Sequence, residues 1–280
     1  ELKLLQAAIR LGHPLLLRAL QQHWLRTEPD LVVSLVPNFN RVLYQSLAST
    51  LPGVPYVTLL TDLADLPPNF WIEADQPQHF ICGTPRAVEQ ARALGHDAAR
   101  IHATSGMVIR PEFYAPITLD RTAERLRLGL DPRRPTGVVL FGGHGSKAML
   151  GIAERLAAAT QLILLCGHNK ALAARLRQLP QSAPRRVVEF TTDITYYMRL
   201  ADFFIGKPGP GSISEAVQQG LPVIVVDNAW TMPQERFNTR WVVDQGLGRV
   251  VRSVSALPEA VQGVLAELPG LRRRVRAIDN

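Results

Sequence analysis

A glycine-rich loop between an apolar run and a helical pattern is the feature that most constrains the fold of this chain. The apolar run is Phe203–Ile205, and the loop Gly206–Gly211 holds three glycines and two prolines before a helical pattern begins at Ser212. The run predicts a buried strand, and the glycines let the backbone approach a ligand closely. Because the first N–H groups and the dipole of a helix favour anions, the loop indicates a phosphate site, although a plain strand-to-helix turn has the same local pattern.

A second apolar run follows that helix and ends in a loop with polar side chains. The run is Pro222–Asp227, and the loop contains Gln234–Asn238. In an open parallel sheet, ligands bind at the carboxyl ends of the strands, so both loops are expected to face one crevice. The first loop is neither a Walker A loop, because no Gly-Lys-Ser/Thr follows at the required spacing, nor a dinucleotide fingerprint.

Alternation of strand and helix signals extends along the whole chain. Strands are expected at Leu31–Val36, Val54–Leu60, Phe80–Cys82, Ile101–Ala103, Gly137–Phe141, Leu162–Cys166, Arg186–Phe190, Phe203–Ile205, Pro222–Asp227 and Arg249–Val251. Continuous apolar strands such as the first are typical of parallel sheets covered on both faces. Residues 106–118 carry two prolines and no periodicity, which indicates a linker. We therefore expect two Rossmann-like α/β domains, residues 1–115 and 116–280.

The charge of the chain favours an anionic partner. The formal net charge is +7 and the isoelectric point is about 9.9. Basic and aromatic residues are not interleaved and no nucleic-acid motif occurs, so we expect no nucleic-acid partner. A diphosphate ligand and an anionic membrane surface are the expected partners. Phe70 and Trp71, in a proline-rich loop, are expected to be exposed for contact with the membrane. No apolar run approaches the roughly 20 residues of a membrane span. Two distant cysteines, Cys82 and Cys166, fit buried positions in a reduced, cytoplasmic protein.

The ordered motifs of the second half resemble the donor-sugar-nucleotide signature of family 28 glycosyltransferases. The resemblance rests on Gly206-Lys-Pro-Gly-Pro-Gly-Ser-Ile-Ser-Glu-Ala216, Gly220-Leu-Pro-Val223, Gln234-Glu235 and Asn238. It covers residues 30–265 and is strongest to monogalactosyldiacylglycerol synthases and diacylglycerol glucosyltransferases. The family implies the GT-B fold, in which two Rossmann-like doubly wound domains face a cleft.

The resemblance also implies which residues bind the donor. Gly142-Gly143-His144-Gly145-Ser146 would meet the diphosphate, Asn169 belongs to a matching turn, and the backbone of Phe190 would recognise uracil. Lys207, Pro208, Gly209, Gly211 and Ser212 would form the second phosphate cradle, with Arg110 as a further partner of the diphosphate. Glu215 would hold the ribose, and Gln234, Glu235 and Asn238 the hexose hydroxyls.

Catalysis in the resembled family needs no metal and no cofactor besides the UDP-sugar substrate. The sequence has no Asp-x-Asp, so backbone N–H groups would stabilise the departing UDP in an inverting displacement. The family's base is a histidine in a glycine-rich loop after the first strand, and none of the seven histidines matches it; Asp62 matches an acceptor-side position. Because the chain starts at Glu1 within a helical pattern, we expect a fragment that lacks the family's first βαβ unit and transfers sugar poorly.

We therefore expect a hexosyltransferase that moves galactose or glucose from UDP to a lipid such as diacylglycerol. It would act peripherally at the cytoplasmic face of the cytoplasmic membrane. The alternatives are a UDP-N-acetylglucosamine transferase of the peptidoglycan or lipopolysaccharide type, a UDP-sugar-binding protein without transferase activity, and an epimerase on the same architecture.

Overall fold

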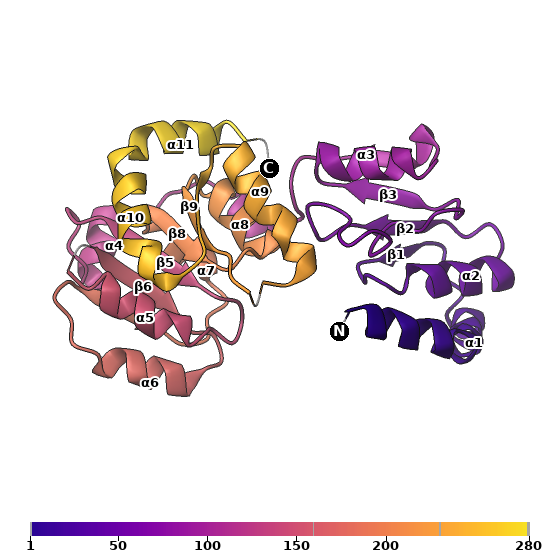
Figure 1. Cartoon of the computed structure of the whole chain (residues 1–280), viewed down its shortest axis with the longest axis horizontal. Helices are drawn as coiled ribbons and strands as arrows, with labels where there is room; N and C mark the ends of the chain where they lie inside the picture. Colours follow the sequence, from indigo (N-terminus) through magenta and orange to yellow (C-terminus); the bar gives the residue numbers. More distant parts are fainter. Residues whose placement is uncertain (1, 159, 230, 279–280) are drawn as a thin grey trace. The chain divides into compact units, whose positions relative to one another are not determined.

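Two parallel β-sheets, each flanked by helices, organise the chain (Figure 1). The structure is a computed structural model that describes residues 2–158, 160–229 and 231–278. The chain divides into two units, Glu1–Met107 and Val108–Asn280, each of which is described by itself below. The division falls inside the expected linker 106–118, ahead of the boundary expected after residue 115.

The first unit is built on a four-stranded sheet with the order β1-β2-β3-β4, all parallel. Its elements are α1 (Leu2–Thr27), β1 (Val32–Ser34), α2 (Asn40–Thr50), β2 (Tyr56–Leu59), β3 (His79–Cys82), α3 (Pro85–Ala93), a 3-10 turn (Ala98–Arg100) and β4 (Ile101–Ala103). A cluster of Trp24, Val32, Leu47 and Tyr56 joins α1 and α2 to the sheet. A second cluster joins α3 to Phe80 and Cys82 of β3.

Strand β1 is only partly covered, and the expectation of cover on both faces is wrong for it. Val32 and Ser34 are buried, but Leu31, Val33 and Leu35 expose 51%, 45% and 52% of their surface. The reason is its position: β1 is an edge strand that pairs with β2, and α1 and α2 pack against one of its faces.

The second unit is built on a six-stranded parallel sheet with the order β10-β9-β8-β5-β6-β7. Its elements are a 3-10 turn (Pro111–Phe113), α4 (Arg121–Arg127), β5 (Thr136–Leu140), α5 (Ala148–Arg155), β6 (Gln161–Leu165), α6 (Lys170–Gln178), β7 (Arg185–Val188), α7 (Ile194–Arg199), β8 (Phe203–Gly206), α8 (Pro210–Gln218), β9 (Val223–Val226), a 3-10 turn (Pro233–Glu235), α9 (Arg236–Asp244), β10 (Gly248–Val251), a 3-10 turn (Val254–Ala256), α10 (Leu257–Ala266) and α11 (Leu268–Arg276). Numbered within the unit, the order is 3-2-1-4-5-6, the doubly wound order of a Rossmann sheet.

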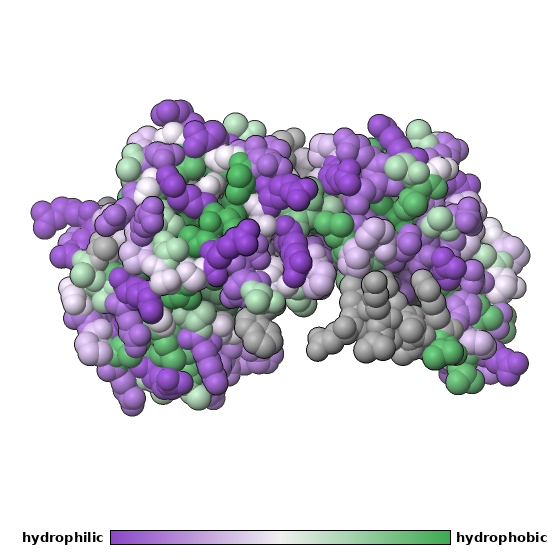
Figure 2. Space-filling view, viewed as in Figure 1, coloured by the Kyte–Doolittle hydropathy of each residue, from purple (hydrophilic) through white to green (hydrophobic). Residues whose placement is uncertain are grey.

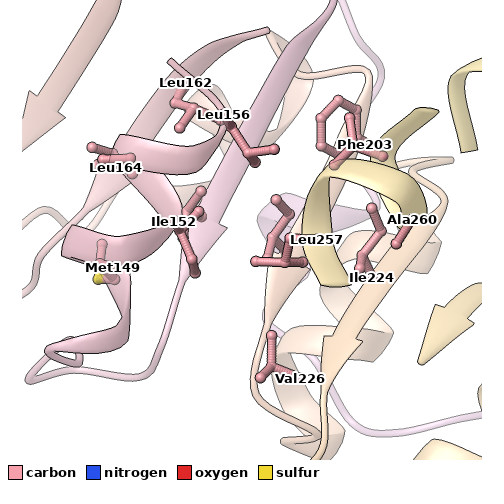
Figure 3. Packing of buried hydrophobic residues seen from close by; sticks show 14 of the residues in the cluster. Met149, Ile152, Leu156, Leu162, Leu164, Phe203, Ile224, Val226, Leu257 and Ala260 are labelled. Carbon is pink, nitrogen blue, oxygen red and sulfur yellow. The ribbon is translucent and has the colours of Figure 1, made fainter. Parts of the chain in front are cut away.

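Fully buried strands explain why this sheet forms. Every residue of β5, β6, β8 and β9 is buried, as expected for parallel strands covered by helices on both faces. Figure 3 shows one of the two covering layers, in which Met149 and Ile152 of α5 and Leu156, the residue after α5, lie near Phe203, Ile224 and Leu257. Burying such side chains is worth about 1.5–3 kcal/mol each, so the apolar layers fix the helices on the sheet.

The segment after the division at residue 107 packs on the second unit. Phe113 is 2% exposed in the core of that unit, and its carbonyl accepts a hydrogen bond from Gln219 Nε2 at 2.7 Å. Arg199 donates to the carbonyl of Ala115 at 2.7 Å. These contacts explain why the division precedes residue 115.

Hydrophilic residues dominate the face drawn in Figure 2, with hydrophobic residues in scattered patches. Within the described ranges, no helix is both long enough and apolar enough to pass through a bilayer.

Candidate functional site

A cavity of about 370 Å³ opens at the carboxyl ends of β5, β6, β7 and β8. Strand order reverses between β5 and β8, and the crevice outside such a switch point is where α/β sheets bind ligands. The cavity is lined by Leu140, Gly142, Gly143, Leu165, Gly167, Glu189, Phe190, Thr191, Ile194, Lys207, Gly209, Pro210, Gly211, Ser212, Glu215 and Glu235.

The first glycine-rich loop, after β5, interlocks with the turn after β6. The N–H of His168 donates to the carbonyl of Gly143 at 2.9 Å. Gly167 lies at φ +58°, and a Cβ atom there would stand 2.0 Å from that same carbonyl oxygen. Only glycine fits this close approach, which draws the two turns together at the cavity wall.

The second glycine-rich loop, after β8, leads directly into α8. Gly209 is the N-cap residue and Pro210 occupies the first turn, where the missing N–H of proline costs nothing. Asn238 of α9 donates from Nδ2 to the carbonyl of Pro208 at 2.7 Å and thereby holds the loop. The open first turn of α8 faces the cavity through Gly211 and Ser212, so its N–H groups and dipole favour an anion there.

Lys207 and Glu235 form an ion pair at the cavity wall. Lys207 Nζ lies 2.7 Å from Glu235 Oε1, and Glu235 is 4% exposed while the lysine side chain is 39% exposed. The lysine therefore presents its charge to the cavity and is positioned by the buried carboxylate.

Glu215 stands in the same cavity with a perturbed carboxyl group. Burial raises its pKa to about 7, against the opposing charge of Arg110 and with a further increase from Glu112. A carboxylate in this position, beside the first turn of α8, can accept two hydrogen bonds from a vicinal diol.

Phe190, the second residue after β7, provides an aromatic wall. The residue is 56% exposed, and its ring stacks on the imidazole of His168, with centroids 4.0 Å apart and planes at 20°. A stacked, half-exposed ring at a cavity wall offers a flat apolar surface to a planar ligand.

Nine of the predicted donor residues line this cavity. They are Gly142, Gly143, Phe190, Lys207, Gly209, Gly211, Ser212, Glu215 and Glu235.

The other predicted donor residues lie outside the cavity lining, and several support its loops. Asn169 caps α6 through Leu172 N and donates to the carbonyl of His144, while Ser146 Oγ accepts from Ala148 N. Arg110 is bound to Glu112 at 2.8 Å and to the carbonyl of Thr192 at 3.1 Å.

Two of the predicted hexose contacts, Gln234 and Asn238, lie outside the cavity lining, and their role stays a prediction. Asn238 is fully buried and contacts Pro208, so it positions the loop, and Gln234 contacts Met232 Sδ at 3.4 Å. Pro208 and Gly145 are likewise loop residues outside the lining.

Sequence reasoning missed five lining residues, namely Leu140, Leu165, Glu189, Thr191 and Ile194. Gly167 and Pro210, which also line the cavity, lie within the turn and the motif that the sequence analysis named. Most of the five missed residues lie at or just after the ends of β5, β6 and β7, so strand ends alone, without any motif, were the signal that could have found them.

On the first unit, the proline-rich loop is folded inward, and the prediction of exposed aromatic residues is wrong. Phe70 and Trp71 are 5% and 1% exposed. The cause is two buried carboxylates: Asp62 accepts from Trp71 Nε1 at 2.9 Å, and Asp65 accepts from the Trp71 backbone N–H at 2.6 Å. The acceptor-side candidate Asp62 is thus part of the packing of this loop.

The structure shows no metal site in the part of the chain that it describes. In residues 2–158, 160–229 and 231–278, no group of three His, Cys, Asp or Glu side chains is placed to hold a metal ion. Cys82 and Cys166 are buried free thiols, and burial raises the pKa of each to about 11.

Comparison with known proteins finds relatives that share one name, monogalactosyldiacylglycerol synthase. The chain is 28% identical over 262 residues to monogalactosyldiacylglycerol synthase 1, chloroplastic, of Arabidopsis thaliana, covering 89% of this chain and 47% of that protein. It is 31% identical over 247 residues to the probable monogalactosyldiacylglycerol synthase 2 of Oryza sativa subsp. indica, covering 80% and 49%. The chain therefore spans about half the length of the curated relatives it matches.

Solved structures share the fold at low sequence identity. The calicheamicin glycosyltransferase CalG4 has a TM-score of 0.67 at 17% identity, covering 98% of this chain and 74% of that chain. MurG of Acinetobacter baumannii has a TM-score of 0.63 at 14% identity, covering 92% and 71%. Anabaena HepE, solved in complex with UDP-glucose, has a TM-score of 0.56 at 17% identity, covering 95% and 76%.

A family model matches part of the second unit, and the matched residues contain the whole lining of the cavity. Residues 138–272 match the glycosyltransferase family 28 C-terminal domain, and they include both glycine-rich loops and Glu215. The second unit therefore contains a match to the glycosyltransferase family 28 C-terminal domain, and the chain as a whole has the α/β architecture of GT-B glycosyltransferases.

Proposed function

We propose that this chain binds a UDP-sugar in the cavity of its second unit and is part of an inverting, metal-independent hexosyltransferase. The observation that carries the proposal is the meeting of two glycine-rich loops, Lys207 and Glu215 at the switch point of the sheet. Together they offer N–H groups for a diphosphate, a cation beside it, and a carboxylate for a ribose diol.

Each part of the donor has a partner in this arrangement. Uracil stacks on the exposed face of Phe190, the diphosphate lies at the first turn of α8 beside Lys207, and Glu215 accepts hydrogen bonds from the ribose hydroxyls. Glu235, with one oxygen on Lys207, accepts from a hexose hydroxyl. As the bond between the anomeric carbon and the UDP oxygen breaks, the charge that develops on UDP meets preorganised N–H groups and Lys207.

The acceptor is proposed from the relatives. The curated relatives are named as monogalactosyldiacylglycerol synthases, and one neighbour was solved with UDP-glucose. UDP-galactose or UDP-glucose as donor and a lipid such as diacylglycerol as acceptor fit both findings. The general base for the acceptor hydroxyl has no assigned residue, so a UDP-sugar-binding role without transfer stands as the second proposal.

Calorimetry with nucleotides tests the donor site. UDP, UDP-galactose and UDP-glucose should bind, with ADP-glucose as the control for the base and UDP-N-acetylglucosamine as the probe of the alternative donor. Glu215→Ala should weaken binding by about 1–3 kcal/mol, because the ribose hydroxyls lose their acceptor. The matched control is Glu154→Ala, an exposed glutamate of α5 in the same unit. Absence of UDP binding, or equal loss in both variants, would contradict the proposal.

Transfer itself is tested with radiolabelled donors and diacylglycerol vesicles. Binding with sugar transfer supports the hexosyltransferase, and binding without transfer supports the second proposal. A longer chain that transfers faster than this one would locate the missing base outside residues 1–280.

We also propose peripheral binding at the cytoplasmic face of an anionic membrane, supported by the net charge of +7. Buried Phe70 and Trp71 give no support, so the attraction should be mainly electrostatic. Flotation with liposomes should then increase with anionic lipid and fall with salt, since the Debye length is about 8 Å at physiological ionic strength. Flotation that is indifferent to both would reject this proposal.

A further inference from the structure

Phe190 is an exposed ring at the end of the second sheet, and its orientation before ligand binding needs support. It follows β7, the last strand in the order of that sheet, and 56% of the residue is exposed. A side chain that moves freely must be ordered when a ligand stacks on it, and this ordering lowers the affinity. A contact that fixes the ring in advance strengthens binding without touching the ligand.

The imidazole of His168 makes a contact of this kind. It stacks on the Phe190 ring with centroids 4.0 Å apart and planes at 20°. Stacked aromatic pairs are favourable beyond the apolar area that they bury. The cavity lining includes Phe190 but not His168, so the imidazole covers one face of the ring and leaves the other face to a ligand in the cavity.

The backbone holds His168 in place independently of its side chain. Its N–H donates to the carbonyl of Gly143 at 2.9 Å, and the preceding Gly167 makes the close approach to the same carbonyl. The interlocked turns after β5 and β6 therefore fix where the imidazole stands. The side chain itself is exposed, and substitution of an exposed side chain usually changes stability little. A change of the imidazole can thus be separated from a change of the loop.

We propose that His168 is a positioning residue of the donor site, whose imidazole holds the Phe190 ring ready to stack on uracil. The inference rests on the proposed function and adds to it a residue that lies outside the cavity lining. Its effect is confined to the base, because the diphosphate is bound by backbone N–H groups that any residue at position 168 leaves in place. The role requires a ring at this position, and it requires neither the charge nor the hydrogen bonds of histidine.

Calorimetry of the whole chain with UDP, and with pyrophosphate through its competition with UDP, tests the inference. His168→Ala should weaken UDP binding about three- to tenfold, the worth of a lost aromatic stack. Pyrophosphate affinity and the melting temperature should stay at their wild-type values. His168→Phe restores a ring and should restore UDP affinity. In a Phe190→Ala background, His168→Ala should cause no further loss, because the two residues act as one unit.

His102→Ala is the matched control. It removes another exposed, stacked imidazole, which lies on His79 in the first unit with planes at 13°, and it should change none of these quantities. If His168→Ala does not fold, His168→Asn, a polar side chain without an aromatic ring, takes its place.

The outcomes separate this inference from the donor site itself. Four results would overturn the role of His168 while UDP still binds: unchanged UDP affinity in folded His168→Ala, an equal loss of pyrophosphate affinity, additive losses in the double variant, or a His168→Phe variant as weak as His168→Ala. A wild-type chain that binds no UDP would reject the donor site, and this inference with it.

Discussion

Replacing Asp202 with asparagine should destabilise the second unit strongly. Asp202 stands at the start of β8, with its side chain 11% exposed, and contacts Arg121 at 2.8 Å, Arg125 at 2.7 Å and Arg272 at 2.7 Å. It also accepts from the N–H of Thr136, the first residue of β5, at 2.8 Å. One carboxylate therefore joins α4, β5, β8 and α11.

Two estimates give the size of the effect. Burial opposes ionisation of Asp202, but the charges of Arg121 and Arg125 outweigh it and lower the pKa from 3.8 to about 2, which at about 1.36 kcal/mol per pKa unit corresponds to roughly 2 kcal/mol. Removing one partner of a buried ion pair typically costs about 3–5 kcal/mol, because the remaining charges lose their partner. We expect a loss between about 2 and 5 kcal/mol.

The sign of the pH dependence follows from the lowered pKa. The stabilisation by Asp202 is fully present above about pH 4, where the carboxyl would be ionised even in the unfolded chain, and it is lost as the pH falls through about 2. Asp202→Asn should therefore lose the part of the acid sensitivity that this carboxyl causes.

Urea denaturation between pH 2 and pH 7, with hydrogen exchange of the β5 and β8 amides to identify the second unit, measures both effects. The matched control is Glu267→Gln, which breaks the exposed pair with Arg249 and should cost less than about 1 kcal/mol. A variant Asp202→Asn that unfolds within 1 kcal/mol of the wild type, with an unchanged acid profile, would refute the reasoning.

Three further predictions concern the donor cavity. UDP-glucose, whose diphosphate does not titrate near neutrality, should bind more tightly as the pH rises from 6 to 8, because the Glu215 carboxyl with its pKa of about 7 becomes ionised. Calorimetry of Glu215→Gln should show an affinity that does not change with pH. A steep pH dependence in this variant would count against the role assigned to Glu215. Gly143→Ala should weaken UDP binding but leave the melting temperature nearly unchanged, because an added Cβ atom meets no atom within 4 Å. Gly167→Ala should lower both the melting temperature and the affinity for UDP, because its Cβ atom would stand 2.0 Å from the Gly143 carbonyl oxygen. Equal melting temperatures of the two variants would show that the clash at Gly167 is relieved. Asn238→Ala should cost about 1–3 kcal/mol of stability, because the carbonyl of Pro208 loses its hydrogen-bond donor. It should also weaken UDP binding through the loop, without a contact between Asn238 and the ligand. Calorimetry that finds wild-type affinity would exclude this positioning role.

The parts of the fold that the sequence predicted best were those fixed by local patterns. The apolar runs 203–205 and 222–227 are the buried strands β8 and β9, and the glycine-rich loop between them leads into α8 as expected. Buried parallel strands have an unmistakable composition, and loops with proline and glycine break the helical period at clear positions.

The parts that the sequence predicted poorly depend on contacts between distant residues. The inward fold of Trp71 requires Asp62 and Asp65 as partners, and a proline-rich composition gives no sign of them. The support of Pro208 by Asn238 joins residues thirty positions apart, so the sequence could not reveal that this amide holds the loop. The cavity lining by Thr191 and Ile194 carries no motif and needs the sheet order to be seen.

Among the described residues no strand pairs with the outer edge of β1, and this has a consequence for how the chain behaves at high concentration. An edge strand offers unpaired N–H and C=O groups to any other extended segment. The exposed hydrophobic side chains of Leu31, Val33 and Leu35 form an apolar stripe beside these groups, which favours association. Two molecules that meet along this stripe can continue one sheet from one chain into the next. Solutions of the chain should therefore scatter light increasingly as they are concentrated, and lysine in place of Val33 should keep them clear.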